Sequence, residues 1–196
     1  MAWHGWEHLG VRGQGNLPPI AGQFRGLDLL VCASGRTLWD DLARYGQRRG
    51  HVMAVNWAGC HLPLRIDHWA SLHPDMLVHW LALHAIWRGH EGHVWTHSHK
   101  PWAGVEFTWD FELQPACSGF FAALLGLALG YDCVVLAGCP ETLDGHYYDT
   151  PGSPGSYTTN YGHQGMWIGA RDTCFAGRVK SLSGNTRDWL GTPDGL

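Results

Sequence analysis

The sequence predicts a single α/β domain whose mainly parallel sheet carries helices on both faces. Short apolar runs of strand character alternate along the chain with longer segments of helical pattern, as in folds built from strand–helix–strand units. The strand runs are apolar at nearly every position, which is typical of strands covered on both faces. The chain has 196 residues, of which 45% are hydrophobic, and this suits one domain with a substantial core.

The N-terminal segment predicts no regular element. Gly and Pro recur in residues 1–26 without a helical or strand-like period. We expect an irregular arm that lies over the domain formed by residues 27–196 and is anchored by Trp3, Trp6 or Phe24.

The first strand is expected at residues 27–33, followed by the best-formed helix in the sequence. Thr37 offers an N-cap, and two aspartates in the next turn suit the positive end of a helix. Arginines gather at the other end, and Gly50 is expected to stop this helix.

The later elements continue the alternation. Strands are expected at 51–56, 66–72, 93–96, 105–109, 132–137 and 178–182. Helices are expected at 76–87, 117–130 and 165–176, with a short last helix that Ser183 caps. Residues 139–162 predict a long loop, and loops of that length in a compact domain are usually functional or mobile.

Two glycine-bearing turns predict a nucleotide site. Ser34-Gly35 follows the first strand, and Ser118-Gly119 opens an apolar helix. Helix starts leave backbone N–H groups free and attract phosphate. Since ligands of open parallel sheets bind beyond the carboxyl ends of the strands, Asn56 and Gly138, which end two other strands, are further candidates.

The blocks 31–38, 54–56, 118–119, 129–131 and 135–138 resemble, in order and spacing, the bacterial sialyltransferases with a Rossmann-like fold. The related 6-hydroxymethylpterin diphosphokinase-like family shares this arrangement. The resemblance covers about residues 27–75 and 115–190. It implies a Rossmann-like domain, and it implies that Ser34, Gly35, Asn56, Ser118 and Gly119 hold a nucleotide.

The same resemblance implies which side chains take part in the reaction. Tyr147 and Tyr148 would steady the leaving phosphate, and phenol hydroxyls can do so without a metal. His163 would act as general base, because its reference pKa of about 6.5 lies near working pH. The alternatives without a catalytic role are that the tyrosines pack on the surface and that the histidine caps the start of a helix.

Arg36 and Asp75 can each be interpreted in two ways. Arg36 follows the first turn and can pair with a phosphate through two parallel hydrogen bonds, or it can be an exposed arginine at a helix start. Asp75 follows the third strand and can hold Mg²⁺ for phosphoryl transfer, or it can be an ordinary acid in the first turn of a helix.

Cysteine and histidine usage does not indicate a metal centre. The six cysteines form no C-x-x-C pair, and we expect free thiols in a reducing compartment. Ten of the fourteen histidines lie between His51 and His99, including the pair His97 and His99. Without an H-E-x-x-H motif, we expect no metal there and histidines that line an open cleft or a tolerant surface.

The net charge, the apolar runs and the absence of known motifs argue against several classes of protein. The net charge of −4 gives no basic footprint for duplex nucleic acid. No apolar run is long enough to span a bilayer, and the first residues lack signal-peptide character, so we expect a cytoplasmic protein. The phosphate-loop, dinucleotide and nucleophile-elbow motifs are absent, which disfavours a standard kinase, dehydrogenase or serine hydrolase.

These observations lead to three hypotheses. The first is a glycosyltransferase that moves a sugar from a nucleotide donor, such as a CMP-sugar, to a small-molecule or glycan hydroxyl, and that requires no cofactor. The second is a diphosphokinase-like phosphoryl transferase that uses ATP and Mg²⁺ through Asp75. The third is a nucleotide-binding module without catalysis. The oligomeric state is not indicated.

Overall fold

The protein folds around one seven-stranded parallel sheet, which confirms the predicted fold class. The computed structural model describes residues 9, 17–46, 50–89, 92–150 and 163–196. The strand order is β5-β4-β3-β2-β1-β6-β7, and every neighbouring pair is parallel. The strands are β1 (Asp28–Cys32), β2 (His51–Val55), β3 (His68–Ser71), β4 (Trp95–Ser98), β5 (Phe107–Thr108), β6 (Cys133–Ala137) and β7 (Val179–Ser181).

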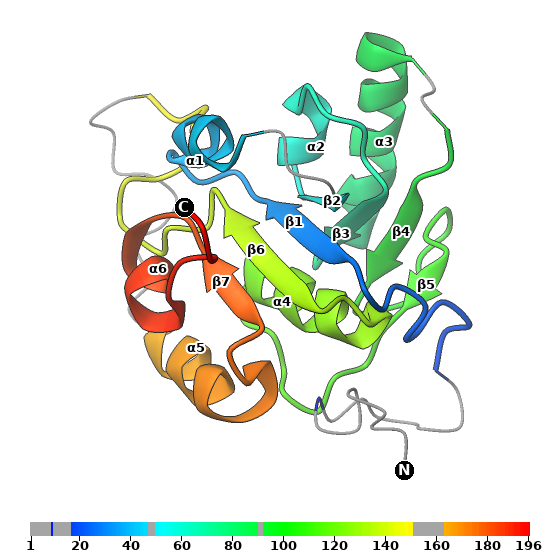
Figure 1. Ribbon diagram of the computed structural model, residues 1–196. Helices are drawn as coiled ribbons and strands as arrows, with labels where there is room; N and C mark the ends of the chain where they lie inside the picture. The colour runs from blue at the N-terminus through cyan, green and yellow to red at the C-terminus, as the bar shows by residue number, and fades with distance from the viewer. Residues whose placement is uncertain (1–8, 10–16, 47–49, 90–91, 151–162) are drawn as a thin grey trace.

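Helices cover both faces of the sheet (Figure 1). The helices α1 (Leu38–Tyr45), α2 (Ala58–His61) and α3 (Pro74–Arg88) lie on one face. The opposite face carries α4 (Ser118–Leu129) and α5 (Gln164–Ala170), which runs into the π-helical turn η3 (Arg171–Phe175). The last helix, α6 (Gly184–Leu190), packs beside β7 and α5. Because side chains alternate along a strand, Leu29 of β1 joins the core under α4, whereas Leu30 joins the core under α1.

The central helix of one face is α4, and all of its residues are buried. Gly126 lets it approach the sheet closely, since a Cβ there would lie 2.8 Å from side-chain atoms of both Leu29 and Val134. In the part of the chain that the structure describes, no helix combines the length and the apolar character needed to cross a bilayer.

The first helix ends earlier than predicted. It stops at Tyr45 because Gly46 takes a left-handed conformation with φ of 68°, whereas the prediction ran to Gly50. Residues 47–49 lie outside the described residues. Thr37 and Ser183 do precede α1 and α6, but neither side chain caps its helix.

A short helix between β2 and β3 was not expected. The sequence there predicts a loop, because four residues are too few to show a helical period. In the structure α2 lies so close to Trp69 that a Cβ on Gly59 would overlap the indole ring. Tertiary packing therefore decides this turn of helix.

The described end of the N-terminal segment packs on the domain, and Phe24 anchors it. Phe24 is buried and stacks on Tyr131 at a centroid distance of 5.0 Å. The backbone N–H of Gly22 donates to Ala128 O and that of Phe24 donates to Leu129 O. Trp3 and Trp6, the other predicted anchors, lie outside the described residues.

The expectation for the histidine-rich stretch is wrong for His68 and His97, which are completely buried. His51 Nδ1 lies 2.6 Å from the Tyr131 hydroxyl, which lies 2.7 Å from His68 Nε2. His68 Nδ1 lies 3.0 Å from His97 Nε2, and Trp109 Nε1 donates to His97 Nδ1 over 3.1 Å. Polar rings can be buried here because each finds a hydrogen-bond partner.

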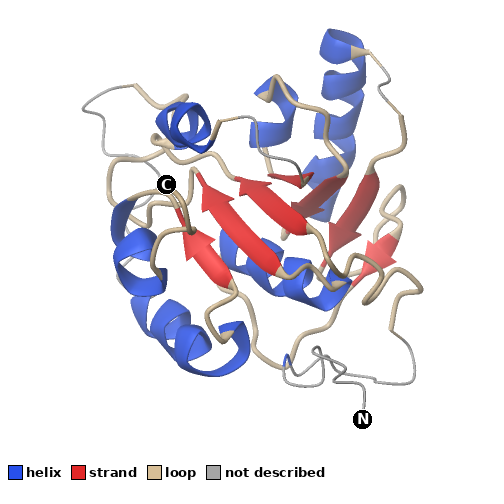
Figure 2. Cartoon of the chain, in the orientation of Figure 1, coloured by secondary structure: helices blue, strands red, loops and turns tan. Residues whose placement is uncertain are grey.

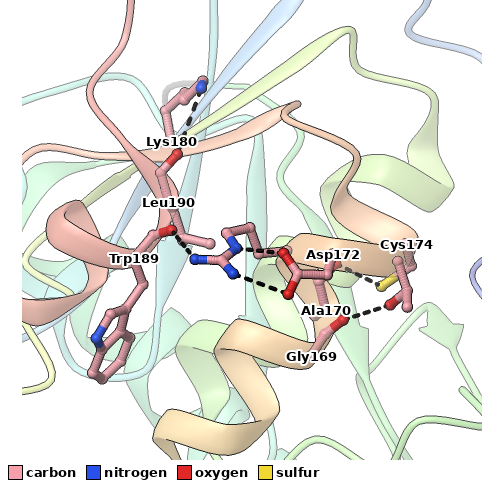
Figure 3. Close-up of polar contacts among 9 residues, drawn as sticks. Gly169, Ala170, Asp172, Cys174, Lys180, Trp189 and Leu190 are labelled. Carbon is pink, nitrogen blue, oxygen red and sulfur yellow. Dashed lines mark hydrogen bonds and ion pairs between the residues drawn. The ribbon is translucent and has the colours of Figure 1, made fainter.

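Polar contacts fasten the C-terminal segment to the sheet edge (Figure 3). The Arg171 guanidinium pairs with Asp172 and also donates to the Trp189 carbonyl over 3.4 Å. Lys180 of β7 donates to the carbonyl of Leu190 over 3.5 Å. These contacts hold α6 against β7, and the start of α6 in turn supports the loop after β6.

Candidate functional site

A pocket of about 280 Å³ opens at the carboxyl ends of β1, β2 and β6. Figure 2 shows the arrowheads of β1 and β6 pointing to the same edge of the sheet. The chain runs outward from β1 through β2 to β5 and then continues with β6 on the other side of β1. Such a reversal of strand order opens a crevice between the loops, and ligands of open α/β sheets bind there.

Both predicted glycine turns line this pocket, together with Asn56 and Gly138. The turns pack tightly on the loop after β6. A Cβ on Gly35 would lie 2.5 Å from Gly138 O, and a Cβ on Gly119 would lie 2.7 Å from Cys139 Sγ. Side chains at either position would push the three loops apart, so glycine is needed for the pocket to form.

Ser34 offers an unused polar atom to the pocket. Its side chain is 7% exposed, and its hydroxyl oxygen has no hydrogen-bond partner. A buried hydroxyl without a partner costs free energy, about 1–3 kcal/mol. A ligand oxygen or nitrogen in the pocket would recover that cost.

The orientation of Asn56 is fixed by Ser71, a residue that the sequence did not single out. Ser71 Oγ accepts a hydrogen bond from His73 N over 2.8 Å, so its own proton goes to Asn56 Oδ1, 2.7 Å away. The side-chain NH₂ group of Asn56 is thereby left to act as a donor. Asn56 also has φ of 53°, a left-handed conformation that asparagine tolerates better than most residues.

The N-terminus of α4 forms another wall. Cys117 is its N-cap, and the thiol accepts a hydrogen bond from Phe120 N over 3.4 Å. Ser118 Oγ accepts from Leu72 N over 3.3 Å and so ties the helix start to the end of β3. A twelve-residue helix that starts at a pocket presents the positive end of its dipole there.

Only one of the two predicted tyrosines lines the pocket. Tyr148 lines the pocket and stacks on His146, which also lines it, at 4.7 Å between ring centroids. Tyr147 is not among the lining residues, and its hydroxyl lies 2.8 Å from His61 Nδ1. Burial, followed by the charge of Asp149, raises the pKa of Tyr148 to about 12, so this phenol keeps its proton at neutral pH.

His146 is a pocket residue that the sequence reasoning missed. Its Nδ1 lies 3.3 Å from Asp149 Oδ2, and its backbone N–H donates to the same oxygen over 2.7 Å. Burial lowers the pKa of His146, and Asp149 works in the opposite direction. A histidine and a carboxylate three residues apart were a readable signal, but the loop conformation that turns His146 to the pocket and Asp149 to His146 was not.

Arg36 does not face the pocket. Its Nε donates to Asp144 O over 2.7 Å, and a terminal nitrogen donates to Asp149 O over 3.1 Å. The structure therefore uses this arginine to hold the 144–149 loop against the first turn, where Gly35 pairs with His146 in a β-bridge. Neither interpretation from the sequence anticipated this position.

His163 is the N-cap residue of α5 and lies behind the pocket lining. Its Nδ1 lies 3.3 Å from Oε2 of Glu141, which does line the pocket. Because a carboxylate can only accept, the shared proton is on Nδ1 and the lone pair is on Nε2. On its other oxygen, Glu141 accepts from the thiol of Cys117 over 3.5 Å.

Glu141 was missed by the sequence reasoning because only the fold gives it a role. It has φ of 48°, a left-handed conformation that is strained for glutamate. Asn185 of α6 holds it there by donating from Nδ2 to Glu141 O over 2.8 Å. Burial and the Glu141 carboxylate raise the pKa of the Cys117 thiol, which therefore stays protonated.

A buried carboxylate lies behind the pocket and joins three loops. Asp41 is 1% exposed, and its Oδ2 accepts from Thr37 Oγ1, Gly138 N and Ser183 Oγ over 3.0, 2.9 and 2.6 Å. Gly138 must be glycine, because it has φ of 65° and a Cβ would overlap Ala33 O. Asp41 thus fixes the end of β6 where it meets the first turn.

Asp75 lies away from the pocket. It is exposed in the first turn of α3 and is not a lining residue. Among the residues that the structure describes, one group of three metal-binding side chains has converging ligand atoms, and it consists of Cys117, Glu141 and His163. His97 and His99 are not part of this group.

No protein-family model matches the chain, and no curated protein matches its sequence. The fold is similar to that of the sialyltransferase CstII from Campylobacter jejuni, solved in complex with a substrate analogue, cytidine-5'-monophosphate. The TM-score is 0.57 at 13% sequence identity, and the match covers 86% of this chain and 85% of that chain. The likeness shows that this chain has a sialyltransferase-like, Rossmann-like α/β fold.

Proposed function

We propose that this protein is a glycosyltransferase that uses a nucleotide-activated sugar, with a CMP-sugar as the first candidate donor. The observation that carries the proposal is the pocket at the strand-order reversal, where Ser34 and Asn56 both present unused hydrogen-bonding groups. The fold likeness to a sialyltransferase in complex with cytidine-5'-monophosphate supports the choice of donor.

The nucleotide is held by the turns around the pocket. Ser34 and Asn56 offer a hydroxyl and an amide to a base or ribose edge. Gly35 and Gly119 allow a ligand to approach the backbone closely. The volume of about 280 Å³ is close to the lower end of small-molecule sites, roughly 300–1,000 Å³, and suits a nucleotide with its sugar at the opening.

Phosphate stabilisation comes from groups that need no metal. The start of α4, at Ser118 and Gly119, provides backbone N–H groups and the positive helix end. Tyr148 keeps its phenolic proton and can donate to a phosphate oxygen as negative charge develops on the leaving group. Tyr147 supports Tyr148 from behind, with 5.2 Å between their ring centroids.

His163 takes the proton of the acceptor hydroxyl at Nε2, and Glu141 holds the ring by accepting from Nδ1–H. The carboxylate also stabilises the imidazolium that forms when the proton moves. The new bond joins the acceptor oxygen to the anomeric carbon of the sugar, and the bond from that carbon to the nucleotide phosphate breaks. CMP leaves with the bonding electron pair.

The test is donor binding followed by turnover. In buffer with EDTA, CMP at a hundredfold excess over its Kd should stabilise the protein by about 2.7 kcal/mol, read as a shift in Tm. Stabilisation only by ATP with Mg²⁺ would replace the proposal with the diphosphokinase-like alternative.

Turnover separates the enzyme from a binding module and tests the base. His163→Ala should lower kcat at least about 100-fold while leaving the Kd for CMP within about twofold. If His146→Ala abolishes turnover and His163→Ala does not, the base assignment is wrong. Tight CMP binding without transfer from any CMP-sugar would indicate a non-catalytic nucleotide-binding module.

A further inference from the structure

We propose that Cys117, Glu141 and His163 bind one Zn²⁺ ion at the edge of the pocket and leave a fourth coordination position open. The three side chains belong to separate segments: the start of α4, the loop after β6 and the start of α5. Their ligand atoms all lie within 4.8 Å of one another. Glu141 is the central member, 3.5 Å from Cys117 Sγ and 3.3 Å from His163 Nδ1.

The two contacts of Glu141 are about as long as the edges of a zinc tetrahedron. Zn–S bonds of about 2.3 Å and Zn–N or Zn–O bonds of about 2.0–2.1 Å place neighbouring ligand atoms roughly 3.3–3.7 Å apart. Each contact of Glu141 has that length, the one to Cys117 through Oε1 and the one to His163 through Oε2. An ion can therefore replace the protons that now join the three groups once the side chains close the remaining separations, none of which exceeds 4.8 Å.

The donor set selects the type of metal. A thiolate and an imidazole together favour zinc over Mg²⁺ and Ca²⁺, which prefer oxygen ligands. Three protein ligands with one open position are typical of zinc sites that accept water or a ligand. Here Cys117 and Glu141 line the pocket, so the open position faces the space proposed for the donor phosphate.

The surroundings hold the ligands in place. Glu141 keeps its strained backbone, with φ of 48°, because Asn185 binds its carbonyl. Side-chain exposure is 9% for Glu141 and 19% for His163, low enough to exclude most water and open enough for an ion to enter. Cys117 is fixed by its role as N-cap of the longest helix on this face of the sheet.

Zinc binding has a consequence that rests on the proposed function. A neutral imidazole that coordinates zinc through Nδ1 carries its proton on Nε2, and it can no longer accept a proton from a substrate. The site would thus be inhibitory, and removal of the ion would restore His163 as a base.

Binding is tested without any activity assay. The metal-free protein is titrated with Co²⁺, which gives a thiolate-to-cobalt absorption band in the near ultraviolet only when a cysteine is a ligand, and then with Zn²⁺ in competition. We expect one equivalent to bind and the thiolate band to appear. Cys117→Ser should abolish the band, and Glu141→Gln should weaken binding at least tenfold.

Two control variants exclude adventitious binding by the other histidines and cysteines. Cys133→Ser, at the start of β6, and His93→Ala, at an exposed site beside Glu106, should leave both the band and the affinity unchanged. A missing thiolate band, or equal affinity in the wild type and Cys117→Ser, would overturn the proposal. Far-ultraviolet circular dichroism of each metal-free variant confirms that the comparison is made on folded protein.

The outcomes for the two proposals are separable. One equivalent of Co²⁺ with a thiolate band supports the metal site even when no donor sugar is transferred. Turnover in EDTA that zinc does not inhibit leaves the proposed function intact and removes only the inhibitory role of the ion.

Discussion

Trp109 Nε1 donates a hydrogen bond to His97 Nδ1, and this contact orders a chain of three further polar contacts through the core. Since Nδ1 of His97 accepts, its Nε2 carries the proton and donates to His68 Nδ1. His68 then donates from Nε2 to the Tyr131 hydroxyl, which donates in turn to His51 Nδ1. One indole group thus selects the tautomers of three histidines.

The first prediction concerns the indole N–H of Trp109. Trp109→Phe removes the N–H and leaves Nδ1 of His97 unpaired in a buried site, which should lower the free energy of unfolding by about 1–3 kcal/mol. Urea unfolding monitored by circular dichroism measures it. Trp102→Phe, at an indole that is 47% exposed, is the matched control and should change stability by less than about 0.5 kcal/mol. If both variants lost the same free energy of unfolding, the proposal that the Trp109 N–H selects the histidine tautomers would be contradicted.

Stability should fall steeply in mild acid. Burial, with His51 as a second cause, lowers the pKa of His68 to about 3, and burial, with His68 as a second cause, lowers that of His97 well below its usual value. Both stay neutral in the folded protein, whereas the unfolded chain takes up protons below about pH 6.5. The groups that face them are His51, Tyr131 and Asp67, which acts on Tyr131.

Because the pKa values of both histidines are lowered in the folded protein, the free energy of unfolding should fall as the pH falls. Above about pH 6.5 the two histidines contribute their full stability, and each loses about 1.4 kcal/mol per pH unit below it. Urea unfolding at pH 7.5 and pH 5.0 should show the loss, and His97→Phe should reduce its slope. His79→Ala, at an exposed site, should not. A free energy of unfolding that is unchanged at pH 5.0 would exclude buried neutral histidines.

Asp41 should be needed for the pocket as well as for stability. Asp41→Ala leaves Thr37, Gly138 and Ser183 without their shared acceptor and should cost roughly 3 kcal/mol or more. CMP affinity should fall with it, because the end of β6 loses its anchor. The neighbouring Asp40 is exposed, and Asp40→Ala should leave both quantities unchanged. Thermal melting with and without CMP compares the two variants.

Gly138 should tolerate no side chain. Gly138→Ala combines a left-handed backbone with an overlap on Ala33 O and should destabilise the protein by more than about 3 kcal/mol. Gly165→Ala is the control, since it lies in α5 with open space around it and an ordinary φ. That variant should be neutral or stabilising by up to about 1 kcal/mol. A mild effect at Gly138 would mean that the first turn and the loop after β6 can separate.

Ser34 should show opposite effects on stability and affinity. Ser34→Ala removes a buried hydroxyl without a partner, so the ligand-free protein should be as stable or more stable, while CMP affinity falls about 5–10-fold. Ser98→Ala removes another such hydroxyl, from β4 outside the pocket lining. It should leave CMP affinity unchanged. Calorimetric titration with CMP distinguishes a hydroxyl kept for a ligand from one that is merely buried.

The sequence alone determined the order of the strands, and of the helices apart from α2, because near-continuous apolar runs such as 29–31 and 134–137 allow little besides buried parallel strands. It also indicated the two glycine turns, since Ser34-Gly35 and Ser118-Gly119 are short-range signals at strand ends and helix starts. The lengths of elements were less accurate, as the early stop of α1 at Gly46 shows.

Only the tertiary structure decided which polar side chains meet. Glu141 with His163, Asp41 with Gly138, and Trp109 with His97 are separated by 22, 97 and 12 residues, and no local pattern records such pairs. Arg36 shows the same limit, because its backbone partners lie more than a hundred residues away in a loop. Backbone pattern is a property of neighbours in sequence, whereas the chemistry of a site depends on groups that the folded sheet brings within hydrogen-bond distance.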